Sequence, residues 1–271
     1  YLLAGKMPLA NLKVKGTVEK QAAIFDEQLE KCGTAYFDRY LLHCLNAENY
    51  QIAQRLDTFS FLMKKKEEGK LHHLGFSFHD KAELLDQILT EHPETEFVQL
   101  QINYLDWEDE RIQSRKCYET AVRHGKKVVV MEPVKGGRLA KLPEEAEKLL
   151  REVHPDWSPA SWAIRFAASL PEVEVVLSGM SDMAQVADNT GFMADFQPLT
   201  EEETALLAKV AEILSALPAV ECTACRYCVA GCPRDIPIPD YFALYNGDQM
   251  ALRQGLPVRK ADYERLAASG G

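Results

Sequence analysis

The stretch Lys127-Val-Val-Val-Met131 decides the fold that we expect for this chain. It is nearly all valine and does not alternate with polar residues, which is typical of a strand buried on both faces of a sheet. Gly125 precedes the stretch and Gly136-Gly137 follow it, so breaks in regular structure lie on both sides. Strands of this kind belong to parallel sheets whose faces are both covered.

Outward from this stretch, apolar strand-like segments alternate with helix-like segments. Strands are expected at 1–4, 36–44, 71–78, 97–104 and 173–177, and the intervening helices at 17–32, 48–68, 80–89, 108–124, 143–153, 158–170 and 182–190. Strict alternation indicates a parallel sheet. Six strands in a row without a glycine-rich dinucleotide fingerprint favour a (β/α)8 TIM barrel, an α/β fold, over a doubly wound sheet. The chain begins abruptly at Tyr1, so we expect a barrel that lacks its first two βα units.

The composition excludes some classes of partner. The chain has 271 residues, 46% of them hydrophobic, and a formal net charge of −10. An acidic balance argues against nucleic acid and against anionic membranes as bulk partners. The apolar runs are shorter than the roughly 18 residues that a membrane helix needs. No signal peptide precedes the chain and its cysteines suit a reducing compartment, so we expect a cytoplasmic protein.

A second region stands out near the C-terminus, where four of the chain's seven cysteines lie close together. The run is Cys222-Thr-Ala-Cys225-Arg-Tyr-Cys228-Val-Ala-Gly-Cys232-Pro233. Its spacing is that of the bacterial ferredoxin run and favours a [4Fe–4S] cluster. Zinc sites usually separate two cysteine pairs by about a dozen residues or more, so zinc is the weaker interpretation, as is a pair of disulfides.

The fourth ligand of such a cluster stays open at this point. In two-cluster ferredoxins the last cysteine of the run binds the other cluster. Two clusters bound only by cysteines would together need about eight cysteines, and the chain has seven. We therefore expect a single cluster closed by Cys232 or, failing that, by a remote ligand. A capping box, Thr200 to Glu203, is expected to open a helix that ends near Leu217. We therefore expect a barrel domain at 1–217 and a small helical iron–sulfur segment at 218–271.

Five motifs in the same order give residues 1 to about 195 a resemblance to the aldo/keto reductase superfamily. They are Gly5-Lys6-Met7-Pro8, Asp38 to His43, Gly75-Phe-Ser77, Gln99-Leu-Gln101-Ile-Asn103, and Gly179-Met-Ser181 continuing through Gln185 to Asn189. The cysteine run behind them resembles the branch of that superfamily with a C-terminal ferredoxin-type segment.

The resemblance implies that Lys6 and His43 are half of a catalytic tetrad. A buried ammonium lowers the pKa of a neighbouring tyrosine, which protonates the substrate oxygen, and an imidazole hydrogen-bonds the carbonyl. The other half, an aspartate and that tyrosine, is expected before Tyr1. Without the resemblance, the simpler interpretation of Lys6 is a surface lysine at a strand end, and that of His43 is a core histidine.

The resemblance also implies a nicotinamide cofactor, NADP or NAD. Ser77 and Gln99 would hold its carboxamide, and Gly136 and Gly137 its pyrophosphate. The adenosine end would lie against three residues, Ser181, Gln185 and Asn189. Two residues depart from the family pattern: Phe78 replaces an asparagine, and Met131 replaces an aromatic residue that stacks on the nicotinamide.

The function expected from the sequence is reduction of a small carbonyl substrate with an accessory [4Fe–4S] cluster and a possible redox partner protein. The alternative is a flavin/iron–sulfur electron-transfer protein on a barrel scaffold. Hydride carries two electrons whereas a cluster accepts one, so a flavin between nicotinamide and cluster would resolve that mismatch.

Overall fold

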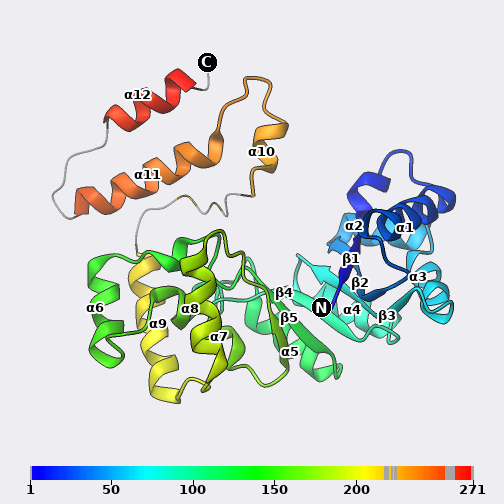
Figure 1. Ribbon diagram of the computed structural model, residues 1–271, viewed down its shortest axis with the longest axis horizontal. Coiled ribbons are helices and arrows are strands. Elements are labelled where there is room, and N and C mark those ends of the chain that lie inside the picture. The colour runs from blue at the N-terminus through cyan, green and yellow to red at the C-terminus, as the bar shows by residue number, and fades with distance from the viewer. Residues whose placement is uncertain (1, 217–219, 221, 223–224, 254–259, 270–271) are drawn as a thin grey trace. The chain divides into compact units, whose positions relative to one another are not determined.

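The valine-rich stretch is strand β5 (Lys127–Met131) of a six-stranded sheet whose strands are all parallel (Figure 1). The computed structural model describes residues 2–216, 220, 222, 225–253 and 260–269. The strand order follows the sequence: β1 (Ala4–Met7), β2 (Phe37–Leu45), β3 (Leu71–Phe78), β4 (Phe97–Gln101), β5 and β6 (Val173–Val176). The α/β class and the parallel sheet expected from the sequence are thus confirmed.

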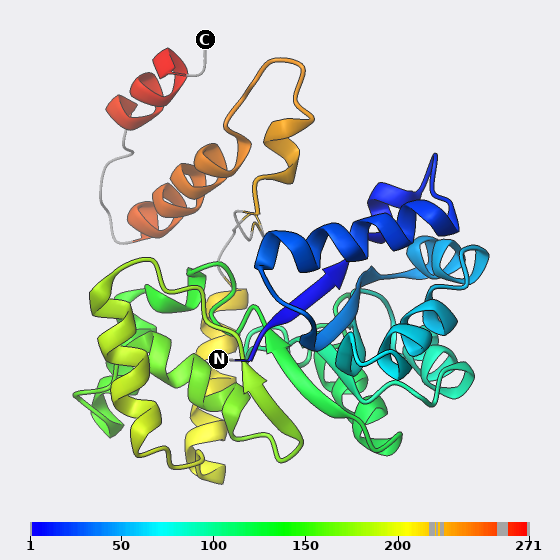
Figure 2. The same cartoon turned by 45° about the vertical axis from the view of Figure 1, so that its right-hand side comes forward.

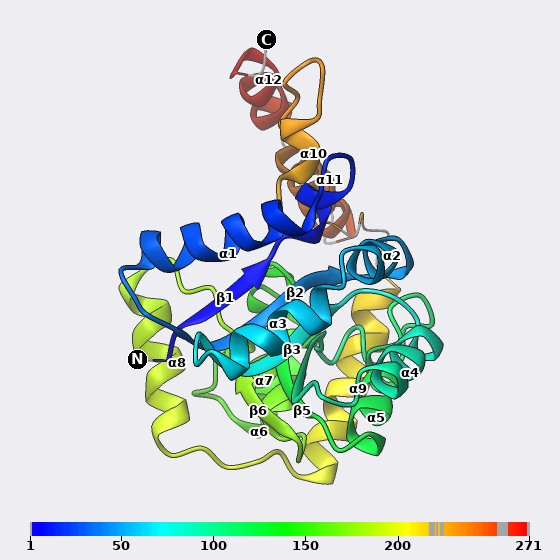
Figure 3. The ribbon, with the colours of Figure 1, turned by 90° about the vertical axis from the view of Figure 1, so that its right-hand side faces the viewer.

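Two units make up the chain, and the sheet lies entirely in the first. Unit 1 comprises Tyr1–Ile102, Asp106–Pro133 and Ala167–Ser178, and unit 2 comprises Asn103–Leu105, Val134–Phe166 and Gly179–Gly271. In unit 1 five α-helices and a short 3-10 helix connect the strands: η1 (Leu9–Leu12), α1 (Val18–Cys32), α2 (Ala47–Arg55), α3 (Thr58–Glu67), α4 (Ala82–Glu91) and α5 (Ser114–Arg123). These helices flank the strands in Figure 3 and pack on one face of the sheet.

The helix-facing side of the sheet is an apolar layer. Tyr40 of β2 identifies this side, because its ring packs against Phe25 of α1 with centroids 4.9 Å apart. One register row on the same side is fully buried along five strands: Met7, Leu42, Phe76, Val98 and Val128. Because side chains alternate along a strand, the neighbouring residues point to the other, inner face.

The inner face is concave. Arg39 Nη2 of β2 lies 2.7 Å from Glu174 Oε2 of β6, although β3, β4 and β5 separate these two strands. In a flat sheet, four strand spacings would separate them by roughly 19 Å. Leu41, Phe97 and Val129 form a buried cluster on the same face. The sheet therefore curls around its inner face, as the strands of a barrel do.

The first strand corrects an expectation, because it runs Ala4–Met7 and not 1–4. Gly5 follows the stretch expected as a strand, but it lies within β1 and faces Tyr40. A Cβ atom on Gly5 would come within 2.7 Å of the Tyr40 ring. Glycine at this position permits close approach of β1 to β2, and it places Lys6 inside the strand.

Two expected helices are also wrong in extent, each at a residue with left-handed backbone. The single helix expected at 48–68 is divided into α2 and α3 by Asp57, whose φ is 48°. The helix expected at 108–124 begins only at Ser114, after Gln113 with a φ of 59°. A left-handed residue cannot continue a right-handed helix, so each marks a boundary.

Unit 2 is helical in its described residues (Figure 2). It contains η2 (Arg138–Ala140), α6 (Glu144–Val153), most of α7 (Pro159–Ala168), α8 (Met183–Ala194), α9 (Glu201–Ser215), α10 (Tyr227–Ala230), α11 (Ile238–Arg253) and α12 (Lys260–Ser269). Both hydrogen bonds of the capping box predicted at Thr200 and Glu203 are present at the start of α9. Among the helices that the structure describes, none is long and apolar enough to cross a membrane.

Candidate functional site

Four of the residues singled out from the sequence meet on the inner face of unit 1, toward the carboxyl ends of neighbouring strands. Lys6 of β1 pairs in register with Leu41 of β2, and Ser77 of β3 pairs with Gln99 of β4. His43 lies two residues beyond Leu41. Enzymes with parallel barrels keep their chemistry at this end of the strands, and the structure brings Lys6, His43, Ser77 and Gln99 to it.

Lys6 and His43 influence each other electrostatically. Burial lowers the pKa of the Lys6 ammonium, and the electrostatic interaction with Cys44 partly opposes this effect. Burial also lowers the pKa of His43, and the positive charge of Lys6 adds to that lowering. In the described part of the chain Lys6 forms no ion pair, so its charge faces an imidazole that is neutral at pH 7. A neutral imidazole can donate a hydrogen bond to a carbonyl oxygen.

Ser77 and Gln99 suit a carboxamide ligand. Both side chains are buried. The Ser77 Oγ atom accepts a hydrogen bond from the Cys44 N–H at 2.7 Å, which leaves its own O–H able to donate. Gln99 Nε2 donates to the Met131 sulfur at 3.1 Å, and a thioether is a weak acceptor that an amide oxygen can replace. The pair therefore offers a donor from each residue on one face of the sheet.

His79 belongs to the same group, and the sequence analysis missed it. Burial lowers its pKa, and the positive charges of His43 and Lys6 lower it further, although part of its surface is exposed to solvent. A signal existed in the sequence: Gly75, Ser77 and His79 are spaced by two, the period of one face of a strand. The polar row on β3 therefore continues past the end of the strand.

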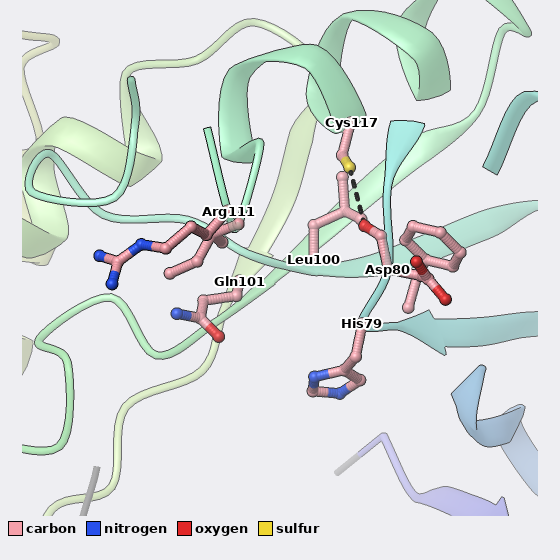
Figure 4. A pocket seen from close by; sticks show the side chains of 8 residues that line it. His79, Asp80, Leu100, Gln101, Arg111 and Cys117 are labelled. Carbon is pink, nitrogen blue, oxygen red and sulfur yellow. Dashed lines mark hydrogen bonds between the residues drawn. The ribbon is translucent and has the colours of Figure 1, made fainter. Parts of the chain in front are cut away.

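His79 also lines a cavity of about 250 Å³ at the rim of the sheet, with Phe78, Asp80, Leu100, Gln101, Arg111, Ile112 and Cys117. Figure 4 shows the Arg111 guanidinium pointing away from Cys117. The helix expected from residue 80 begins at Ala82, and the Asp80 side chain does not cap it. Instead its carboxylate accepts from the N–H groups of Ala47, at 2.9 Å, and Lys81, at 2.8 Å. Asp80 thus joins two loops around the cavity.

Unit 2 carries the other five residues expected to contact the cofactor. Gly136 and Gly137 have left-handed φ angles of 61° and 91°, so backbone N–H groups turn within a tight loop there. Ser181 donates its N–H to Gln185 Oε1 at 2.7 Å just before α8, so the Gln185 amide serves the start of the helix. The helix cap is Asp182, which accepts from the Gln185 N–H at 2.9 Å. Asn189 lies one turn further along α8 and is half-buried.

The cysteine run surrounds the short helix α10. Cys225 and Cys228 are exposed, and Cys222 and Cys232 are half-buried. Arg226, left-handed with a φ of 62°, forms a forked ion pair with Asp240 of α11 at 3.1 and 3.2 Å. Within the described residues no three histidine, cysteine or acidic side chains are placed to hold a metal ion. The thiols have the right chemistry for a cluster, but in these positions they do not lie together around one site.

A comparison with known families identifies the family of this chain. The family model described as "Aldo/keto reductase family" matches residues 1–212. The chain belongs to the aldo/keto reductase family. Membership makes it an NAD(P)H-dependent oxidoreductase, as the motifs had implied.

Solved structures of aldo/keto reductases share the fold. The holo form of AKR11C1 from Bacillus halodurans is 24% identical with a TM-score of 0.58, over 77% of this chain and 71% of that one. An aldo/keto reductase from Brucella melitensis is 21% identical with a TM-score of 0.59, over 77% and 73%. One from Klebsiella pneumoniae, in complex with NADP and acetate, is 18% identical with a TM-score of 0.60, over 78% and 70%. None of the curated protein sequences matches the chain significantly.

Proposed function

We propose that the protein reduces a small carbonyl substrate with NADPH or NADH, using the inner face of unit 1. One observation carries this proposal: Lys6, His43, Ser77 and Gln99 come from four neighbouring strands and meet at their carboxyl ends. In a member of the aldo/keto reductase family, these positions fit two tasks. Lys6 and His43 act on the carbonyl, while Ser77 and Gln99 hold the cofactor.

His43 is suited to orient the substrate. Its lowered pKa keeps the imidazole neutral at pH 7, so the ring can donate to the carbonyl oxygen without transferring a full proton. Lys6 provides a positive charge at the same strand ends, which stabilises negative charge developing on that oxygen and lowers the pKa of an adjacent phenol.

The proton donor is not assigned to a residue of this chain, because three candidate tyrosines have packing roles. Tyr40 faces α1 and donates its hydroxyl to Gln28 at 2.7 Å. Tyr36 stacks on His72 with ring centroids 4.4 Å apart. Tyr104 is buried against Phe166 in unit 2, with centroids at 6.3 Å. These contacts agree with the packing roles expected for all three residues.

The cofactor supplies the hydride when bound, and residues of this chain would hold it. Ser77 and Gln99 suit the carboxamide because each side chain has a donor directed to the inner face. In unit 2, the left-handed turn at Gly136 and Gly137 suits the pyrophosphate, since glycines without side chains let the backbone approach a ligand closely. The adenosine end is proposed to contact Ser181, Gln185 and Asn189. The Klebsiella pneumoniae relative was solved with NADP, which supports this class of cofactor.

The larger architecture follows as part of the proposal. We assign the six strands to strands three to eight of an eight-stranded barrel, with the barrel domain ending near residue 217 and a separate segment at 218–271. The motif order and the curled sheet support this assignment. A reducing compartment, the cytoplasm, fits a protein with exposed thiols at Cys225 and Cys228.

An accessory [4Fe–4S] cluster at Cys222, Cys225, Cys228 and Cys232 is the second part of the proposal. Its support is the ferredoxin spacing. No step of the reduction is assigned to the cluster, so it would stabilise the segment or serve a redox partner protein. Protein purified anaerobically should contain about four irons and four sulfides per chain, and Cys225→Ser should lose most of both. One zinc and no iron in the unchanged protein would contradict the cluster.

Cofactor binding and turnover together test the reductase. In the intact protein, NADPH or NADH should be consumed when a reducible aldehyde is added. Fluorescence titration should show that Gln99→Ala weakens cofactor binding, because the amide that contacts the carboxamide is lost. Gln87→Ala is the matched control, since Gln87 is on the exposed surface of α4. Cofactor affinity equal in both variants would contradict the assigned role of Gln99.

A further inference from the structure

Strand β2 contains one residue more than its partner at the point where the candidate site lies. Leu42 pairs with Phe76, and the next pair along the ladder is Leu45 with Phe78. Two residues, His43 and Cys44, therefore lie opposite a single residue of β3, Ser77. This arrangement is a β-bulge, a feature that redirects side chains and is common next to active sites.

The bulge lets Leu45 return to the helix-facing side while His43, two residues after Leu41, stays on the inner face. Leu42 and Leu45 are both fully buried and pair with Phe76 and Phe78, which lie on one face of β3. In a regular strand, residues three apart point to opposite faces. The extra residue allows both leucines to pack under the sheet while His43 and Cys44 turn to the inner face. Both of these residues respond to the charge of Lys6, which agrees with that placement.

Cys44 adopts a conformation that side chains disfavour. Its φ is 61°, in the left-handed region, where the Cβ atom of a non-glycine residue is crowded against the backbone. Two buried side chains hold it there. Its N–H donates to Ser77 Oγ at 2.7 Å, and its carbonyl accepts from Asn49 Nδ2 at 2.7 Å. Ser77 is fully buried and Asn49 is 7% exposed, so water does not replace either bond readily.

We propose that Asn49 and Ser77 are positioning residues, which lock the bulge at Cys44 so that His43 faces the substrate carbonyl. This inference rests on the proposed function. Asn49 belongs to the first turn of α2, so it transmits the position of that helix to the strand end. Ser77 has one hydroxyl for two tasks: its oxygen holds the bulge, and its proton remains for the cofactor. Through this hydroxyl, the cofactor contact and the direction of His43 are linked.

The same chain supplies matched controls for both positions. Asn46, three residues before Asn49, caps α2 by accepting from the Asn49 N–H at 2.9 Å. In the described residues its side chain forms no hydrogen bond with Cys44. Asn46→Ala should therefore weaken the helix alone. Asp57 is an exposed left-handed residue between α2 and α3, so Asp57→Val introduces the same backbone strain as Cys44→Val away from the site.

The test follows the His43 imidazole by NMR titration in the intact protein, with its signal identified by comparison with His43→Gln. In Asn49→Ala and in Cys44→Val the ring should turn toward solvent, and its pKa should rise toward the ordinary value of about 6.5. Turnover should fall about tenfold to a hundredfold with a smaller change in KM, because the carbonyl is misplaced. Asn46→Ala and Asp57→Val should lower the melting temperature without moving the His43 titration.

Glycine offers a rescue that a purely structural role does not predict. In Asn49→Ala/Cys44→Gly, the left-handed conformation no longer opposes the bulge, so the His43 titration and turnover should return toward the wild-type values. If Asn49→Ala fails to fold, Asn49→Asp keeps the shape while removing the donor and serves the same comparison.

Two outcomes separate this inference from the proposed function. An unchanged His43 titration and turnover in Asn49→Ala, in a protein whose wild type reduces aldehydes, would overturn the positioning role alone. A moved His43 titration in a protein that reduces no aldehyde would support the positioning role and contradict the reductase proposal.

Discussion

The two ends of the same inner face differ in whether a positive charge is paired with a carboxylate. At the amino end, the Arg39 guanidinium is paired with Glu174 at 2.7 Å and lies 5.2 Å from the centroid of the Phe97 ring. At the carboxyl end, Lys6 lies near His43 and Cys44, and burial lowers its pKa. Both cations are on neighbouring strands of one sheet, only two register positions apart.

The difference separates a structural charge from a chemical one. The Glu174 carboxylate offsets part of the hydration that Arg39 loses, while Arg39 Nη1 is buried without a hydrogen-bond partner among the described residues, so this cation is held within the fold. Lys6 lacks such a partner within the described residues, and its charge therefore remains available to a reacting oxygen. Sites of this kind commonly reduce stability while providing function.

The largest effect should come from removing the uncompensated charge. Lys6→Met in the intact protein should lower turnover on an aldehyde by about 10²- to 10⁴-fold, because proton transfer loses the group that assists it. Cofactor affinity should change far less, and fluorescence titration measures it separately. Lys64→Met, on an exposed helix end, is the matched control. Near-normal turnover in Lys6→Met would place the chemistry elsewhere.

Removing the compensated charge should affect the fold and not the reaction. Arg39→Met should lower the free energy of unfolding by about 1–2 kcal/mol, since it loses an ion pair and an aromatic contact. The value is modest because Glu174 is 46% exposed and can be hydrated once its partner is gone. Chemical denaturation measures the change. A loss of turnover as large as that of Lys6→Met would show that the two ends are not distinct.

Lys6→Met should leave stability unchanged or slightly higher, the reverse of Arg39→Met. The sign follows from the lowered pKa of Lys6. At pH 7, below the unfolded pKa of a lysine, a base that binds its proton less tightly when folded destabilises the native state. A methionine of similar shape removes that penalty. Denaturation midpoints of the two variants, measured side by side, should therefore move apart.

The smallest effect concerns acid. Burial lowers the pKa of both His43 and His79. Each contribution to stability is complete above about pH 6.5 and is lost as the pH falls from there through the lowered pKa. His43→Gln/His79→Gln should therefore flatten the fall in melting temperature between pH 7 and pH 5. His72→Gln, at the exposed amino end of β3, is the control. An identical acid slope in both variants would contradict the lowered pKa of His43 and His79.

Sequence patterns predicted most of the fold because they depend on local chemistry. The valines of β5 and the capping box at Thr200 are complete within a few residues, and both were confirmed. Gly5 misled the analysis, since glycine is typical of turns and only the Tyr40 ring across the sheet explains its place in a strand. No local feature of the sequence at Asp57 indicated that this residue would divide a helix.

For the candidate site, the sequence predicted residue types but not their surroundings. Lys6 and His43 were found from motifs, whereas His79 was missed because its role depends on the face it shares with Ser77. The bulge at Cys44 was also missed, although the spacing of Leu42 and Leu45 was a usable signal. For the cysteine run the sequence predicted a cluster. In the described residues the thiols are not placed together so as to hold a metal ion, and the cluster stays a prediction.

The close approach at Gly5 has a consequence for how this protein tolerates mutation. Any side chain at position 5 must move the Tyr40 ring or push β1 away from β2, and Phe37 lies only 3.1 Å from the same point. Residue 5 immediately precedes Lys6, so a single added methyl group would displace the lysine relative to His43. Position 5 therefore sets the spacing of the two groups without acting on substrate, and variation there would alter the reaction geometry together with the packing of β1 on β2.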